Sequence, residues 1–144
     1  MAGRHVSDVA DEIVDALREI CARLPECVEE TAWVGTRWRI RGRTFAHVLT
    51  VDAGWPPAYA SAIGEPGPIT LLMFRSAGDE LDVLRNSGRP FFAPPWRDDE
   101  VGMILDDVSV DWDEIGELVT ESYCAQAPLR LARTVAARPD EPPS

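Results

Sequence analysis

Lysine is absent from this chain of 144 residues, and all 14 basic residues are arginine. This absence excludes a phosphate-binding loop built around a lysine, a Schiff-base lysine and a catalytic ammonium group. Histidine is almost absent as well, with only His5 and His47. His5 is near the N-terminus. His47 has two readings: a neutral histidine satisfied within the core, or a general base or ligand contact that needs a polar partner.

Cysteine is scarce, and its spacing matches no known site. Cys21, Cys27 and Cys124 are odd in number and lack the C-x-x-C spacing of a zinc or redox site. We therefore interpret them as small buried apolar residues. No apolar run approaches the roughly 18 residues of a membrane span, and the first residues lack the apolar core of a secretory signal. We expect a cytoplasmic protein with no membrane association.

The chain has few basic residues relative to acidic ones, 14 against 25, and its formal net charge is −11. Such a charge repels polyanions at long range and argues against non-specific nucleic-acid binding. No serine stands in a nucleophile-elbow pattern, no histidine or cysteine cluster has metal-ligand spacing, and the glycines are dispersed among turns. The sequence therefore predicts no catalytic residue, no metal and no cofactor.

The pattern of apolar residues predicts the secondary structure. Ser7 is a suitable N-cap for a helix whose apolar stripe runs from Val6 to Leu24. Strands are expected at 28–33, 36–51, 69–74 and 101–105, with an edge segment at 91–96. Further helices are expected after Ser76, after the cap Asp111 and after Pro128. This order predicts an α+β fold, an antiparallel β-sheet with helices packed on one face, in a single domain of residues 1–137. The acidic, proline-rich residues 138–144 are expected to form a disordered tail.

The segment Thr36–Val51 alternates with period two, and Gly42 stands where the chain must reverse, so we predict a β-hairpin turning at Gly42-Arg43. The residues assigned to its core face are Trp38, Ile40, Phe45, His47 and Leu49, with His47 opposite Trp38. The hairpin also carries a cluster of arginines, Arg37, Arg39, Arg41 and Arg43. These form either a solvated face paired with acids such as Glu29 and Glu30, or a site for phosphate or carboxylate groups.

A long loop, residues 52–68, follows the hairpin, and proline and glycine break its periodicity. Its aromatic residues Trp55 and Tyr59 either fold down over the sheet edge or form a lid that contacts a ligand. A second candidate site is therefore a pocket between the hairpin, this loop and the edge segment, lined by His47, Trp55, Tyr59 and Trp96. On the first helix, an acidic stripe is either a solvated face or a weak cation-binding ridge; it comprises Asp8, Glu12, Asp15 and Glu19.

Several short motifs follow one another in a characteristic order. They are Leu24-Pro25-Glu26, Glu29–Trp33, Trp38–Ala46, Phe91–Trp96, Val101–Asp106, and Asp111–Glu114 leading to Ala127-Pro128. In order and spacing these motifs resemble the MmcQ/YjbR family of small bacterial proteins, from about Ile13 to Ala132. The resemblance implies a frataxin-like (CyaY-like) fold and, because family members are commonly labelled DNA-binding, DNA as a partner.

Two positions depart from the family pattern. Asp99-Glu100 stand where many members have Gly-Trp, and Ile104 stands where many have Arg; both changes reduce positive or aromatic character. The first hypothesis is a non-enzymatic binding protein that contacts DNA through the hairpin arginines. The alternatives are a small anionic metabolite in the aromatic pocket and a weak cation on the first helix. The sequence leaves the oligomeric state open.

Overall fold

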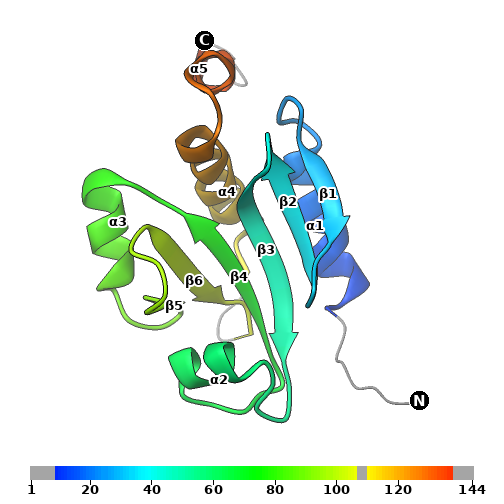
Figure 1. Cartoon of the computed structure of the whole chain (residues 1–144), viewed down its shortest axis with the longest axis vertical. Coiled ribbons are helices and arrows are strands. Elements are labelled where there is room, and N and C mark those ends of the chain that lie inside the picture. The colour runs from blue at the N-terminus through cyan, green and yellow to red at the C-terminus, as the bar shows by residue number, and fades with distance from the viewer. Residues whose placement is uncertain (1–8, 107–109, 138–144) are drawn as a thin grey trace.

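Six strands form one antiparallel sheet in the order β1-β2-β3-β4-β6-β5 (Figure 1). The computed structural model describes residues 9–106 and 110–137. The strands are β1 (Val28–Thr31), β2 (Thr36–Ile40), β3 (Arg43–Val51), β4 (Ile69–Arg75), β5 (Phe91–Phe92) and β6 (Glu100–Ile104). The hairpin β2–β3 thus lies inside the sheet, and the short strand β5 forms an edge, as Phe91–Trp96 was expected to do.

Five helices accompany the sheet: α1 (Asp11–Cys21), α2 (Pro57–Ile63), α3 (Gly78–Arg85), α4 (Trp112–Gln126) and α5 (Leu129–Ala137). Figure 1 shows α1 and α4 behind the sheet, and their apolar residues form one core with it. The predicted α+β class with an antiparallel sheet is confirmed, and α1 and α4 cover one face of the sheet as expected. The short helix α2 comes from the long loop and packs on the opposite face through Ile63.

The helix caps follow the sequence only in part. The Asp111 carboxylate accepts hydrogen bonds from the backbone N–H groups of Asp113 and Glu114 at 3.0 and 3.2 Å, as expected of the predicted N-cap of α4. Helix α1 begins at Asp11 with Ala10 at its N-cap, whereas the proposed cap Ser7 lies outside the described residues. The predicted tail, residues 138–144, also lies outside them.

The face of the sheet toward α1 and α4 is entirely apolar at its centre. Trp38 and Phe45 are fully buried there, and the ring of Phe45 meets the ring of Tyr123 from α4 edge to face at a centroid distance of 5.4 Å. The Trp38 indole N–H donates to the Glu29 carboxylate at 3.1 Å, which satisfies its polar atom at the rim of the core. Burial of these large rings supplies much of the driving force for folding.

A β-bulge in the hairpin moves two residues of the predicted core face, His47 and Leu49, to the face away from α1 and α4, where Leu49 is buried in the cluster that contains Ile63. The turn is formed by Arg41 and Gly42, both at positive φ, one residue earlier than the predicted Gly42-Arg43. The register shifts between Trp38 and Arg39, so that Phe45 has no partner on β2. Phe45 stays on the face of Trp38, where the prediction placed it, and the extra residue brings Ala46 to that face as well. The same shift pairs His47 with Arg37 instead of with Trp38, so His47 points to the face away from α1 and α4.

The buried hydroxyl of Ser122 satisfies the backbone beside the bulge. It donates to the Phe45 carbonyl at 2.6 Å and accepts from the Arg75 N–H at 2.7 Å, and the Ser122 side chain is fully buried. Buried backbone groups need such partners because their desolvation is costly. Helix α4 therefore stabilises the irregular point of β3, which in turn fixes the direction of His47.

Candidate functional site: a cavity on the outer face of the sheet

The sheet face turned away from α1 and α4 carries a cavity of about 390 Å³. Strands β3, β4 and β6 form its floor, the β1–β2 connection forms one wall, and α2 with the segment before β6 forms the other. Its lining includes Trp33, Arg37, Thr44, His47, Tyr59, Arg75, Trp96, Arg97 and Glu100. The volume lies in the range typical of small-molecule sites.

The wall formed by the β1–β2 connection positions His47. Gly35 has a φ of 77°, and a Cβ at this residue would lie 1.9 Å from the Val48 carbonyl oxygen, so only glycine allows so close an approach to β3. The approach brings the Val34 carbonyl oxygen to 2.6 Å from Nε2 of His47. Because a carbonyl can only accept, the proton of neutral His47 lies on Nε2 and Nδ1 is an acceptor.

Burial lowers the pKa of His47 below its ordinary value, and the positive charge of Arg37 lowers it further, against the opposing hydrogen bond to Val34. His47 is therefore neutral near pH 7. Each of the two sequence-based interpretations of His47 agrees with part of this result. It is satisfied and neutral, yet it lies at a cavity and not in the main core.

Aromatic rings extend from His47 across the cavity. The ring of Tyr59 meets that of His47 at a centroid distance of 6.4 Å and that of Trp96 at 4.9 Å, in both cases nearly edge to face. Burial raises the pKa of the Tyr59 hydroxyl, with a further contribution from Glu100, so this hydroxyl stays protonated. Three of the four predicted pocket residues are thus brought together, and they offer one apolar wall with polar edges.

The fourth predicted pocket residue, Trp55, lies beside the cavity. Its ring packs against that of Trp33 at a centroid distance of 5.1 Å, and it is Trp33, not Trp55, that lines the cavity. Trp33 is 78% exposed, which is unusual because contact of so large an apolar side chain with water is unfavourable. Sequence reasoning missed Trp33 because it ends the first predicted strand, where alternation does not assign it a face.

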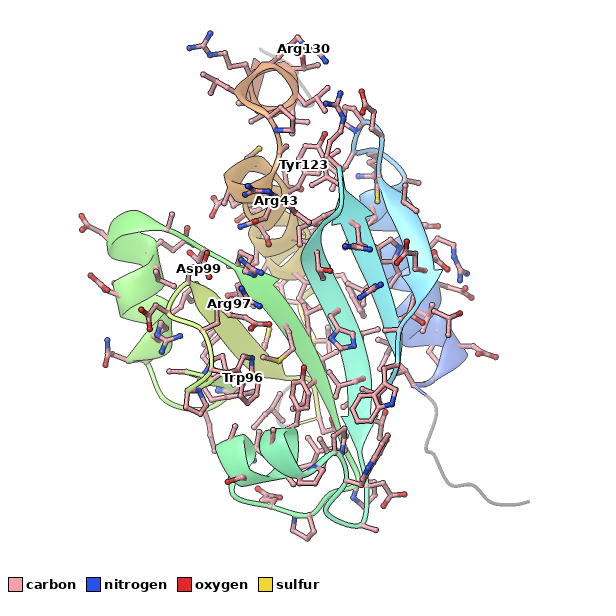
Figure 2. The ribbon with its side chains drawn as sticks, viewed as in Figure 1. Arg43, Trp96, Arg97, Asp99, Tyr123 and Arg130 are labelled. Carbon is pink, nitrogen blue, oxygen red and sulfur yellow. The ribbon has the colours of Figure 1, made fainter. Side chains whose placement is uncertain are left out.

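Charged side chains complete the floor and the second wall. Figure 2 shows Trp96, Arg97 and Asp99 grouped over the β4–β6 part of the sheet. Arg75, only 15% exposed, forms an ion pair with Asp99 at 3.2 Å. Glu100, 13% exposed, accepts from the Trp96 indole N–H at 3.0 Å and lies 3.6 Å from the Arg97 Nε.

Burial raises the pKa of the Glu100 carboxyl, although its hydrogen bond from Trp96 and the charges of Arg75 and Arg97 act in the other direction. Sequence reasoning did not select Arg75, Arg97 or Glu100. The signal available was the clustering of charges at the paired ends of β4 and β6, where Arg75 and Glu100 face each other. That pairing depends on the strand order, which local sequence does not give.

The hairpin arginines do not form an open positive row. Arg37 and Arg39 both contact Glu30 on β1, at 2.9 and 3.4 Å, and Arg41 contacts Glu26 at 2.6 Å. These arginines lower the pKa values of the Glu30 and Glu26 carboxyls through their hydrogen bonds. Arg43 pairs with Ile40 in the register and so belongs to the other face of the sheet. Of the four, only Arg37 reaches the cavity.

The third candidate site, the acidic stripe on α1, is less well formed than the cavity. Within residues 9–106 and 110–137, no group of three or more metal-ligating side chains could hold an ion. In the acidic stripe, Asp15 forms an ion pair with Arg18 at 2.8 Å, while Asp8 lies outside the described residues. Over the same part of the chain, no helix combines the length and apolar character that crossing a membrane requires.

These features define a class: a small α+β protein with one sheet face covered by helices and an aromatic, arginine-containing cavity on the other. Comparison with known proteins refines this class. The YjbR family model matches residues 22–125, more than half of the chain, and the protein belongs to the YjbR family.

Solved structures of similar fold include a Deinococcus radiodurans protein and a Pseudomonas syringae protein. The Deinococcus radiodurans protein DR2400, which has a DUF419 domain, superimposes with a TM-score of 0.58 at 18% identity, over 91% of this chain and 92% of that one. The Pseudomonas syringae protein superimposes with a TM-score of 0.55 at 11% identity, over 82% of this chain and 98% of that one. No curated protein matches this chain. The family and the fold are therefore established, and function must be argued from the cavity.

Proposed function

We propose that this protein is a non-enzymatic binding protein for a small anion with a planar aromatic group, held in the cavity around His47. The observation that carries the proposal is the convergence of Arg37, Arg75 and Arg97 with the rings of Tyr59 and Trp96 on one cavity of about 390 Å³. Arginine binds carboxylate and phosphate groups through two parallel hydrogen bonds, and aromatic walls bind planar rings. The arginines and the aromatic rings lie next to each other in this cavity, so one ligand can contact both.

The partners of the arginines support an exchangeable anion site. Arg97 has a side chain 51% exposed and lies 3.6 Å from Glu100, so its guanidinium can turn toward a ligand at little cost. The Arg37 side chain is 36% exposed at the cavity wall and forms an ion pair with Glu30 at 2.9 Å, so a ligand would have to share it with that carboxylate. Arg75 is more deeply placed and is held by Asp99, which makes it a fixed positive group below the site.

The chemistry of the lining supports the non-enzymatic part of the proposal. Among the described residues that line the cavity, there is no serine or cysteine to act as a nucleophile. The Nε2–H of His47 donates to the Val34 carbonyl. The Nδ1 of the neutral ring can therefore accept a hydrogen bond from a donor on the ligand. The site therefore has the groups for recognition.

A thermal-shift titration tests the proposal with adenosine 5′-monophosphate and 4-hydroxybenzoate as aromatic anions. Adenosine, which lacks the charge, and inorganic phosphate, which lacks the ring, serve as the two half-probes. A ligand at about 100 times its Kd stabilises the folded state by about 2.7 kcal/mol, which raises Tm by roughly 5–10 °C in a domain of this size. At least one aromatic anion should produce such a shift, and each half-probe a smaller one.

Paired variants locate the effect. Arg97→Gln should reduce the shift by removing an anion contact, whereas Arg41→Gln, also an exposed arginine but outside the cavity, should leave it unchanged. No shift with any aromatic anion, or an equal loss in both variants, would count against the cavity as the site.

Binding of DNA through the hairpin is the second candidate, supported by family resemblance and by the exposed position of Arg43 at the start of β3 (Figure 2). It is the weaker candidate because Glu26 and Glu30 engage the other three arginines and the net charge is −11. A shift assay on duplex and single-stranded DNA at low salt tests it. Salt-dependent binding that disappears when Arg37, Arg39, Arg41 and Arg43 are all replaced by alanine would establish it; its absence would remove it.

A further inference from the structure

Two of the three cysteines meet at the end of α1. Helix α1 ends at Cys21, and the chain turns before β1 begins at Val28. The Leu24 N–H donates to the Cys21 carbonyl at 2.9 Å, and the Cys27 N–H donates to the Leu24 carbonyl at 3.3 Å. This turn, which passes through Glu26 at a positive φ of 61°, returns Cys27 to Cys21.

The two thiols differ in access to solvent. The Cys21 side chain is buried in the apolar core, with 1% exposure, whereas Cys27 is half-buried at the edge of that core. Both cysteines line a second cavity, of about 470 Å³, bounded by the end of α1 and by Glu29 and Trp38. A small reagent entering from solvent therefore meets Cys27 first and finds Cys21 beside it.

Each of the two thiols also changes the pKa of the other. A hydrogen bond between the side chains of Cys21 and Cys27 lowers the pKa of Cys27 and raises the pKa of Cys21, while burial raises both. Thiolate is the form that attacks peroxides, so Cys27 is the more reactive of the pair. In Cys124, by contrast, burial raises the pKa, and the S–H donates to the Ala132 carbonyl at 3.8 Å on a different part of the fold.

We propose that Cys21 and Cys27 are a redox pair that forms a reversible intramolecular disulfide when the folded protein meets hydrogen peroxide. The Cys27 thiolate attacks one peroxide oxygen; an S–O bond forms, the O–O bond breaks, and hydroxide leaves to give Cys27 sulfenic acid. The Cys21 sulfur then attacks the Cys27 sulfur; the S–S bond forms, the S–O bond breaks, and water leaves with the Cys21 proton. Two thiols lose two electrons, and one peroxide becomes two waters.

This pairing is not evident from the C-x-x-C rule, since a longer turn separates the two residues. It is independent of the proposed ligand site, which lies on the opposite face of the sheet from Trp38. A small-molecule thiol such as dithiothreitol is the chemical class that reverses the bond, by thiol–disulfide exchange.

Thiol counting on the folded, full-length protein tests the proposal. The folded protein is treated with hydrogen peroxide, excess oxidant is removed, and the chain is unfolded in urea so that maleimide reaches the buried Cys21. Labelling should then fall from three cysteines to one, and dithiothreitol should restore it to three. Peptide mapping should find Cys21 joined to Cys27. Three labelled thiols in the treated folded protein, or a disulfide that joins Cys124 or two chains, would overturn the proposal.

Single-cysteine replacements separate the roles. Cys124→Ser is the matched control and should still lose both remaining thiols on oxidation. In Cys21→Ser, Cys27 should stop at sulfenic acid and react with dimedone, whereas Cys27→Ser should give no dimedone adduct on Cys21. Should Cys21→Ser fail to fold, the mapped disulfide in the Cys124→Ser protein decides the question alone; its absence there refutes the redox pair.

Discussion

The two faces of one sheet differ in chemistry, although their residues alternate along the same strands. Toward α1 and α4, β2 and β3 present Trp38 and Phe45, which are fully buried and pack against Tyr123. On the other side the same strands present Arg37 and His47 at the rim and floor of a cavity. The helix-covered face holds the larger apolar core, whereas the outer face combines a smaller apolar cluster with the cavity. Four changes test this division.

The largest effect is expected from Phe45→Ala on the covered face. Removal of a fully buried ring that contacts Tyr123 should lower the free energy of unfolding by about 3–5 kcal/mol, through lost burial and a cavity. Urea denaturation measures the change. Tyr59→Phe, on the outer face, keeps its ring and should cost less than about 1 kcal/mol. Similar losses in the two variants would break the comparison.

Ser122→Ala should have the next largest effect, because it removes the hydroxyl that joins α4 to the bulge. The Phe45 carbonyl and the Arg75 N–H would lose their partner in a buried place, at a cost of about 2 kcal/mol. Ser61→Ala, at an exposed position of α2, is the control and should change stability by less than about 0.5 kcal/mol. A neutral Ser122→Ala would mean that the bulge does not need α4.

His47 should make stability depend on pH from the outer face. Its pKa in the folded protein lies below the ordinary 6.5, so the unfolded chain binds the proton more tightly. The stabilisation is present above pH 6.5 and is lost as pH falls below it, by at most about 1.4 kcal/mol per pH unit. Denaturation at about pH 7.5 and 5.5 should show a steeper loss in the native protein than in His47→Gln. Parallel curves would contradict a buried, neutral His47.

The smallest effect is expected at Glu121 on α4. A hydrogen bond with Glu80, burial and the charge of Glu117 raise the pKa of Glu121 from 4.5 to about 7. The folded protein therefore binds more protons between these values, and stability falls as pH rises through that window. Because Glu121 is exposed, Glu121→Gln should add only about 0.5–1 kcal/mol at pH ~8 and almost nothing at pH ~5. An equal gain at both pH values would exclude this cause.

Local sequence was sufficient for most of the fold. Alternation located the strands of the hairpin, and Asp111 marked the start of α4, because hydrophobic period and capping are local properties. The bulge at Phe45 could not be predicted from local sequence, since the Ser122 hydroxyl that binds its carbonyl lies far along the chain. The frataxin-like description, drawn from resemblance, stays a prediction beyond the confirmed YjbR fold.

The candidate site was predicted in part. His47, Tyr59 and Trp96 do meet, since the long loop had to return to the hairpin, but Arg75 and Glu100 become neighbours only through the β4–β6 pairing. For the hairpin, the reading as arginines paired with β1 acids agrees with the contacts of Glu30. Strand order, not residue type, therefore decides which charged side chains lie at the cavity.

The central claim is that the outer face binds an aromatic anion, and the indole N–H signals of the five tryptophans test it most directly. During titration with adenosine 5′-monophosphate or 4-hydroxybenzoate, two-dimensional ¹H–¹⁵N NMR should show the Trp96 indole signal moving, because its N–H lies in the cavity wall on Glu100. The Trp38 indole signal, held by Glu29 on the covered face, should stay in place. Movement at Trp38 with none at Trp96, or no movement at all with either anion, would contradict the account.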